Sequence, residues 1–304
     1  MARRHGRSLA ALLTVVALAA CSGGDSAGPS STGSPGLNTT TSTGAAITST
    51  TTTAHASTTG ATPFTTAGPD TPLEVDADIR APEGEGPFPA VVLVHGGGWV
   101  AGDPSIMRPL ARHLNDNGFL TLNIRYALSS LGLPGYPQAV DDVACAVRVA
   151  ASHPDSDGTV AIVGHSAGAH IGALVALTGD RYAEDCPAPG TGIPDRFVGL
   201  AGPYDASRLG LAMQVFFGAG LDAAPDLWAA GNPQELADAN PELESLIMYG
   251  EFDGLIDEHF ALEFFEALHT SGSTALLELV EGARHNEMHD PDLVGDLIVT
   301  WLGR

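Results

Sequence analysis

The sequence contains no lysine, and its 13 basic residues are all arginines, set against 36 acidic residues for a formal charge of −23. So few cations cannot neutralise a phosphate backbone, which excludes nucleic acid as a partner and argues against attraction to anionic lipid. The 3 cysteines are too few for a disulfide-dense small fold or a four-cysteine zinc site. A hydrophobic content of 44% is nevertheless sufficient for a globular core.

The first 20 residues have the pattern of a secretory signal peptide. Arginines at positions 3, 4 and 7 precede an apolar run of 12 residues (9–20), which is too short to span a bilayer because a spanning helix takes about 20. The run ends in Leu18-Ala19-Ala20-Cys21, which resembles the lipobox of bacterial lipoproteins. The resemblance implies a diacylglyceryl anchor on Cys21 and a location on the cell membrane, facing outside the cytoplasm. The alternative is an ordinary signal peptide with an incidental cysteine.

Residues 21–72 are a separate block of composition, rich in serine and threonine. Positions 22–72 contain 16 Thr and 8 Ser but few large apolar side chains. Such a segment cannot bury enough surface to offset its loss of conformational entropy, so we predict a flexible tether. Residues 73–304 remain, and their 232 positions are an ordinary length for one α/β domain.

Within residues 73–304, apolar strand patterns alternate with helical ones. The predicted strands are residues 73–79 (a half-exposed edge), 89–95, 119–124, 159–163, 197–200, 245–249 and 275–280. The predicted helices are residues 105–117, 136–152, 167–178, 260–268 and 291–301. This alternation is typical of a mostly parallel central sheet with helices on both faces. Residues 203–244, the longest stretch between predicted strands, are a candidate for a small cap.

The motif Gly-x-Ser-x-Gly occurs around Ser166, as Gly-His-Ser-Ala-Gly at positions 164–168. The same pattern occurs by chance around Ser26, in the tether, where no strand or helix is predicted beside it. Ser166 instead follows an apolar strand and begins an apolar helix, which is the strand–turn–helix context of a nucleophile elbow. The flanking glycines are needed there because Cβ atoms would clash in the tight turn.

A second glycine motif, His-Gly-Gly-Gly-Trp at positions 95–99, follows the first buried strand. Such a loop presents backbone N–H groups to an oxygen on which negative charge develops. The N–H of Ala167, directly after Ser166, is the expected complementary donor. The alternative is a glycine-rich turn with no role beyond its geometry.

An acid and a histidine are expected after Ser166, in that order. Asp253 follows the strand at 245–249, with Glu251 and Asp257 as alternatives. His285 follows the strand at 275–280, with His289 as its alternative. His285 and His289 also have the spacing of metal ligands on a helix, but no further His or Cys nearby supports a metal site.

This order of motifs resembles the α/β-hydrolase superfamily. Within it, the chain is similar to the HGGG-type esterase/lipase group (hormone-sensitive-lipase-like), and to feruloyl-esterase-like and kynurenine-formamidase-like hydrolases. The resemblance covers residues 73–304 and implies an α/β-hydrolase fold. It implies a catalytic triad of Ser166, His285 and Asp253, and oxyanion donors at Gly97, Gly98 and Ala167.

The resemblance also implies a serine hydrolase that cleaves carboxylic esters through an acyl-enzyme, with no metal or organic cofactor. Its substrate would be a small-molecule ester or an ester on a polysaccharide or lipid, and no protein partner is predicted. Two alternatives stay open. One is an amide or formamide hydrolase (arylformamidase-like or a peptidase) with the same triad, and the other is an inactive surface binding protein.

Two further predictions concern cysteines and aromatic residues. Cys145 and Cys186 remain once Cys21 is lipidated, and outside the cytoplasm such a pair predicts a disulfide. Two separate buried thiols are the alternative. Five aromatic residues are candidates for lining an apolar acyl pocket, and the alternative is that most of them are core residues. They are Trp99, Tyr204, Phe216, Phe217 and Trp228.

Overall fold

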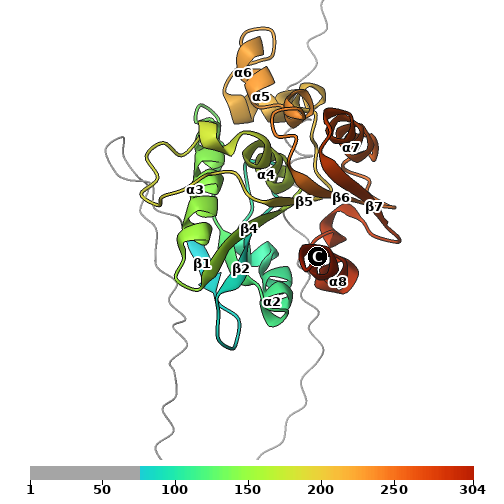
Figure 1. The fold of residues 1–304 in the computed structure, drawn as a ribbon. Coiled ribbons are helices and arrows are strands. Elements are labelled where there is room, and N and C mark those ends of the chain that lie inside the picture. Colours follow the sequence, from blue (N-terminus) through green and yellow to red (C-terminus); the bar gives the residue numbers. More distant parts are fainter. Residues whose placement is uncertain (1–75) are drawn as a thin grey trace, which may run out of the picture. The chain divides into compact units, whose positions relative to one another are not determined.

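A computed structural model describes residues 76–304, so the predicted signal peptide, Cys21 and the tether lie outside the described residues. The described part contains one seven-stranded sheet with the order β1-β3-β2-β4-β5-β6-β7 (Figure 1). The strands are β1 (Ala77–Arg80), β2 (Phe88–Val94), β3 (Leu120–Ile124), β4 (Ser156–His165), β5 (Arg196–Leu200), β6 (Glu244–Gly250) and β7 (Thr274–Val280). Only the edge strand β1 is antiparallel to its neighbour, and the other pairs of this sheet are parallel.

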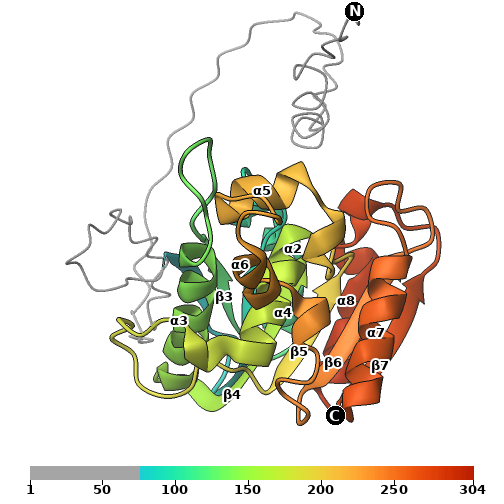
Figure 2. The same ribbon diagram turned by 90° about the horizontal axis from the view of Figure 1, so that it is seen from above.

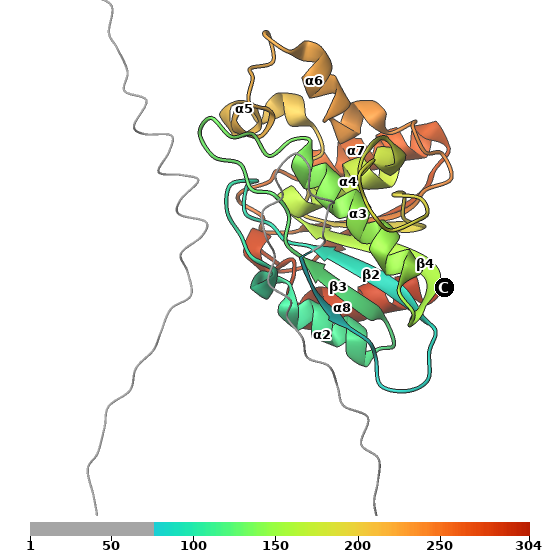
Figure 3. The same cartoon turned by 90° about the vertical axis from the view of Figure 1, so that its left-hand side faces the viewer.

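Helices cover both faces of the sheet, as the alternating pattern predicted. On one face lie α3 (Gln138–Ser152), α4 (Ala167–Thr178) and α7 (His259–Ser271), and on the other α2 (Arg108–Asp116) and α8 (Pro291–Leu302) (Figure 3). Successive residues of β2 alternate between the two cores, because side chains of a strand point to opposite faces. Val92 belongs to the α3/α4 side and Leu93 to the α2/α8 side.

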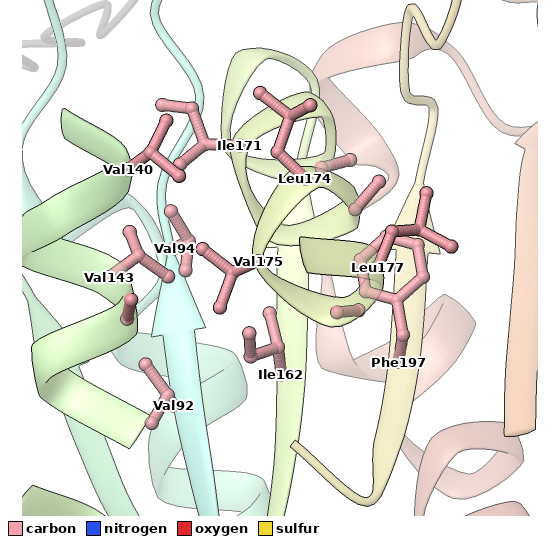
Figure 4. Packing of buried hydrophobic residues seen from close by; sticks show 14 of the residues in the cluster. Val92, Val94, Val140, Val143, Ile162, Ile171, Leu174, Val175, Leu177 and Phe197 are labelled. Atoms are coloured by element: carbon pink, nitrogen blue, oxygen red, sulfur yellow. The ribbon is translucent and has the colours of Figure 1, made fainter. Parts of the chain in front are cut away.

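The core on the first face forms between α3, α4 and the central strands. Figure 4 shows Val143 of α3 and Val175 of α4 packed over Val92 and Ile162 of the sheet. Every residue of α4 is buried. A helix that is apolar all round must be enclosed by protein, and α4 is therefore a rigid support for what lies at its first turn.

Residues 203–244 form a separate outer layer over α4. The segment contains two short helices, α5 (Leu211–Phe217) and α6 (Pro225–Ala230), together with 3-10 turns at Ala206–Arg208 and Pro233–Leu236 (Figures 1 and 2). Prolines and glycines interrupt the segment, which keeps its helices short. The predicted cap thus has an observed counterpart on the α3/α4 side of the sheet.

Two predicted helices begin later than expected. The helix predicted from residue 105 starts at Arg108, because the chain first forms a 3-10 turn at Pro104–Ile106 that the Asp103 side chain caps. The helix predicted from residue 136 starts at Gln138, after Pro137 at its N-cap.

Cys145 and Cys186 form a disulfide, with 5.4 Å between their Cα atoms. The bond joins α3 to the loop that follows α4, and it confirms the cysteine pair predicted from the sequence. No helix among residues 76–304 is both long and apolar enough to cross a bilayer.

Candidate active site

The turn between β4 and α4 has the geometry of a nucleophile elbow. Ser166 has φ 53° and ψ −119°, a conformation that a residue with a side chain rarely adopts. A Cβ on Gly164 would lie 2.4 Å from the carbonyl oxygen of Gly168, and one on Gly168 would lie 2.2 Å from that of Val94. Both flanking glycines are therefore required by backbone crowding around the turn that carries Ser166.

The structure brings the three predicted triad side chains together. His285 Nε2 lies 2.9 Å from Ser166 Oγ, and His285 Nδ1 lies 2.8 Å from Asp253 Oδ2. A carboxylate can only accept, so Nδ1 carries the proton and Nε2 is left to accept from the serine hydroxyl. The side chains of His285 and Asp253 are 9% and 4% exposed, which shields their interaction from water.

Asp253 is fixed by the loop that follows β6. Its Oδ1 accepts hydrogen bonds from the N–H groups of Leu255 and Ile256, each at 2.9 Å. Burial opposes ionisation of this carboxyl. The hydrogen bond and charge of His285 and the two backbone donors outweigh that penalty, and the pKa of Asp253 lies below its ordinary value. Asp253 is therefore a carboxylate at neutral pH.

The alternative acids and the alternative histidine have other contacts. Glu251 accepts from the N–H of Gly282, and Asp257 pairs with the exposed His259. His289 packs edge-on against His165. Geometry thus selects Asp253 and His285. In the described part of the chain, no three His, Cys, Asp or Glu side chains are arranged to hold a metal ion.

His165 is a contributor that the sequence reasoning did not identify. Its Nε2 lies 3.0 Å from the backbone oxygen of His285, and because a carbonyl only accepts, Nε2 carries a proton and donates it. Burial, together with the nearby His285 and His289, places the pKa of His165 well below its ordinary value, so the ring is neutral. His165 thereby restrains the backbone that carries the predicted base.

The glycine loop after β2 runs beside Ser166. A Cβ on Gly96 would lie 3.2 Å from Ser166 Cβ, and one on Gly97 would lie 1.9 Å from the carbonyl oxygen of Ala101. Gly97 and Gly98 have φ of 131° and 60°, which glycine adopts readily. Among residues 76–304, no acceptor binds the backbone N–H groups of Gly97, Gly98 or Ala167. The predicted oxyanion donors are thus not used in the backbone hydrogen bonding of the described residues.

The five aromatic residues considered for an acyl pocket are all buried. Tyr204 stacks on Phe264 with 4.3 Å between ring centroids, a contact that favours the core alternative for this residue. The other four form a continuous cluster through the contacts Trp99–Phe216, Phe216–Phe217 and Phe217–Trp228. This cluster links the glycine loop to the outer layer of residues 203–244.

Comparison with known proteins shows which family this chain resembles. The BD-FAE family model matches residues 77–268, which is more than half of the chain. The chain belongs to the BD-FAE family. The match includes Ser166 and Asp253 and ends before His285. The strand β7, His285 and α8 therefore lie beyond the matched residues.

One curated relative of this BD-FAE chain is Esterase LipC from Mycobacterium tuberculosis (strain ATCC 25618 / H37Rv). It is 27% identical over 217 residues, covering 66% of this chain and 53% of LipC. The chain therefore spans about half the length of the curated relative that it matches.

Solved structures show the same fold at lower identity. A truncated carbohydrate esterase from gut microbiota matches with a TM-score of 0.64 and 20% identity, over 75% of this chain and 90% of that one. An acetyl ester-xyloside bifunctional hydrolase from Caldicellulosiruptor lactoaceticus matches with a TM-score of 0.65 and 18% identity, over 78% and 90%. The predicted α/β-hydrolase fold and the predicted resemblance to its esterases are confirmed.

Proposed function

We propose that this BD-FAE protein is a serine hydrolase of carboxylic esters. The observation that carries the proposal is the continuous hydrogen-bonded path from Ser166 Oγ through His285 to Asp253, beside three unoccupied backbone donors. Membership of BD-FAE and the likeness to LipC favour ester hydrolysis over amide hydrolysis, because LipC and the structural neighbours are named as esterases.

In the first half of the reaction, Ser166 Oγ attacks the ester carbonyl carbon while His285 Nε2 takes the hydroxyl proton. Asp253 keeps the imidazole in the required tautomer and stabilises its cation. The carbonyl oxygen becomes negative and accepts hydrogen bonds from the N–H groups of Gly97, Gly98 and Ala167. His285 then donates its proton to the departing alcohol, and an acyl-Ser166 remains.

In the second half, His285 takes a proton from water, which attacks the acyl carbon. The same backbone donors stabilise the second tetrahedral intermediate, and its collapse returns the proton to Ser166 and releases the carboxylic acid. The whole cycle consumes one ester and one water molecule, releases the alcohol and the acid, and restores Ser166 and His285.

We propose an ester of a carbohydrate or of a small alcohol as the substrate class. Two structural neighbours are a carbohydrate esterase and an acetyl ester-xyloside hydrolase, which supports a short acyl group on a sugar. The excess of acidic residues is a further argument, since it disfavours strongly anionic substrates.

We also propose that the enzyme acts outside the cytoplasm, attached through a lipid on Cys21. The disulfide between Cys145 and Cys186 supports this location, because disulfides persist in oxidising compartments. The Cys21→Ser substitution should move the protein from the membrane fraction to the soluble fraction. Equal membrane retention of both forms would contradict the anchor.

The activity is tested by acyl release from p-nitrophenyl esters of acetyl to dodecanoyl length. The Ser166→Ala variant should lose turnover by about 10⁶-fold, the loss seen when a serine nucleophile is removed. Ser26→Ala is a matched control, because Ser26 lies in the same motif but in a sequence that predicts no strand or helix beside it. No turnover of any ester by the wild-type chain, with turnover of formamides, would favour the amide alternative.

A further inference from the structure

His170 is a buried histidine to which the proposed mechanism assigns no role. It lies on α4, one helical turn after Ser166, and is 0% exposed. Both of its ring nitrogens are used. Nδ1 lies 3.3 Å from the indole Nε1 of Trp99, and Nε2 lies 3.0 Å from the backbone oxygen of Gly231.

These two contacts fix the tautomer of His170. An indole N–H can only donate and a carbonyl oxygen can only accept. Nδ1 is therefore the acceptor and Nε2–H the donor. Burial supports this assignment, because it lowers the pKa of His170 to about 4 and keeps the ring neutral near pH 7. A protonated ring would lose the acceptor that Trp99 requires.

Trp99 directly follows the proposed oxyanion donors Gly97 and Gly98. Its φ of 63° lies in the left-handed region, which is unfavourable for a residue with a large side chain. Such a conformation persists only where the surroundings over-determine it. Three contacts do so here: the hydrogen bond to His170, the ring contact with Phe216 at 5.8 Å, and the N–H of Ser129, which donates to the Trp99 oxygen at 2.7 Å.

We propose that His170 is a positioning residue for the oxyanion hole, which fixes the Gly97–Gly98 turn relative to Ser166 through its hydrogen bond to Trp99. The inference rests on the proposed function, since it assumes that Gly97 and Gly98 bind the oxyanion. Ser166 is the N-cap residue of α4, and His170 belongs to the first turn of that enclosed helix. The nucleophile and the anchor of the loop therefore share one rigid frame, and the donors need no rearrangement during the reaction.

The second nitrogen of His170 connects the same helix to the outer layer, through Gly231. The two bonds can be separated by substitution. Asparagine places its amide oxygen near the position of Nδ1, and glutamine places its amide nitrogen near that of Nε2. His170→Asn thus keeps an acceptor for Trp99 and loses the bond to Gly231, whereas His170→Gln does the reverse.

The experiment compares these variants in the full chain with p-nitrophenyl butyrate. For His170→Gln we expect kcat to fall about 100-fold with KM changed by less than about threefold, the pattern of a lost oxyanion contact. His170→Asn should keep kcat within about fivefold of the wild type. Trp99→Phe, which removes the donor but keeps an aromatic ring, should match His170→Gln, and the double variant should lose no more than either single one.

A readout independent of catalysis is the indole N–H signal in ¹H–¹⁵N spectra. The chain has 3 tryptophans, and the signal missing in Trp99→Phe belongs to Trp99. It should shift upfield in His170→Gln and remain near its wild-type position in His170→Asn. If His170→Gln does not fold, the single variant Trp99→Phe decides the question by its kcat and KM.

Several outcomes would overturn the inference. Wild-type kcat in His170→Gln or in Trp99→Phe would do so, and so would equal losses of kcat in His170→Gln and His170→Asn. A Trp99 signal unchanged by His170→Gln would show that the bond does not exist. A wild-type chain without esterase activity would overturn the proposed function and this inference with it, and is distinguishable because the variants play no part in that result.

Discussion

The two halves of the candidate site are held in place by different forces. In the half that carries Ser166 and the glycine loop, backbone crowding is added to the Trp99–His170 bond, with Gly97 and Gly168 at points where a Cβ would meet a carbonyl oxygen at 1.9 and 2.2 Å. The half that carries Asp253 and His285 depends on hydrogen bonds. Backbone N–H groups fix the carboxylate, and the His165 ring fixes the backbone of His285.

Steric crowding and hydrogen bonding suit different tasks in the reaction. Steric crowding defines position without adjustable partners, and it suits groups whose location must not change while charge develops. Hydrogen bonds define orientation and charge together, and they suit an acid–base pair whose proton moves. Loss of a hydrogen-bonding group from the acid–base half should therefore reduce turnover, whereas a Cβ added at a crowded glycine of the other half should reduce stability.

Apart from loss of the nucleophile Ser166 itself, the largest expected effect is on the acid–base half. Asp253→Asn should lower kcat about 10⁴-fold, because an amide favours the wrong tautomer of the imidazole. The midpoint of urea unfolding should change little. Asp257→Asn is the matched control and should retain wild-type kcat, since Asp257 pairs with His259 rather than with His285. A large loss of kcat in the control and none in Asp253→Asn would show that Asp253 is not the acid of the triad.

The disulfide should matter to stability more than to chemistry. The paired variant Cys145→Ala/Cys186→Ala opens a loop with a sequence separation of 41, which corresponds to about 4 kcal/mol of unfolding free energy in the chain-entropy treatment. Urea denaturation at pH 7 measures this loss, and kcat below the new unfolding transition should stay close to that of the wild type. A comparable fall in kcat for the folded variant would show that the bond also positions Ser166.

Acid should act on His170 and on Asp253 at different pH. The pKa of His170 is lowered to about 4, so between about 6.5 and 4 the unfolded chain binds a proton that the folded chain does not. Stability should fall by about 3 kcal/mol across that window. The pKa of Asp253 is also lowered, so its contribution is present above about 3.9 and is lost only as pH falls through its folded pKa.

Unfolding free energies measured from pH 7 to 3 test this order. His170→Asn should flatten the curve between about pH 6.5 and 4, and Asp253→Asn should flatten it only below about pH 4. Parallel curves for His170→Asn and the wild type over the upper window would mean that His170 is not the group responsible.

The smallest predicted effect concerns the elbow. Gly168→Ala places a Cβ 2.2 Å from the Val94 oxygen and should cost about 1–3 kcal/mol of unfolding free energy, with kcat reduced as well because Ser166 moves. Gly158→Ala is a control of the same chemistry, since a Cβ there meets nothing within 4 Å, although its φ of 93° adds backbone strain. Equal destabilisation of the two variants would remove crowding as the explanation.

The same difference explains what could be predicted from the sequence. The positions of Gly97, Gly164 and Gly168 leave no room for an unstrained Cβ, so they produce motifs that are visible without a structure. The acid–base half uses backbone N–H groups, which any residue but proline supplies. Order along the chain therefore favoured Asp253 and His285, but only the structure separated them from Asp257 and His289.

The histidines beside Ser166 show where sequence reasoning ends. His165 donates to a carbonyl oxygen 120 positions away, and His170 to one 61 positions away. A bond from a side chain to a distant backbone group leaves no spacing pattern in either segment. The sheet and its five covering helices were predictable from apolar periodicity, whereas α5 and α6 were not, because they are too short to show a period.

The disulfide also keeps the chain covalently connected when a peptide bond between its two cysteines is cut. Cys145 and Cys186 enclose β4, Ser166 and all of α4 in a closed ring that also contains the exposed turn around Pro154 and Asp155. One peptide bond cut inside that ring leaves both fragments attached to each other. A nicked molecule would travel as a single species on a gel without reductant and as two once the bond is reduced. The segment that carries Ser166 is thus retained by the protein even after a protease has cut it.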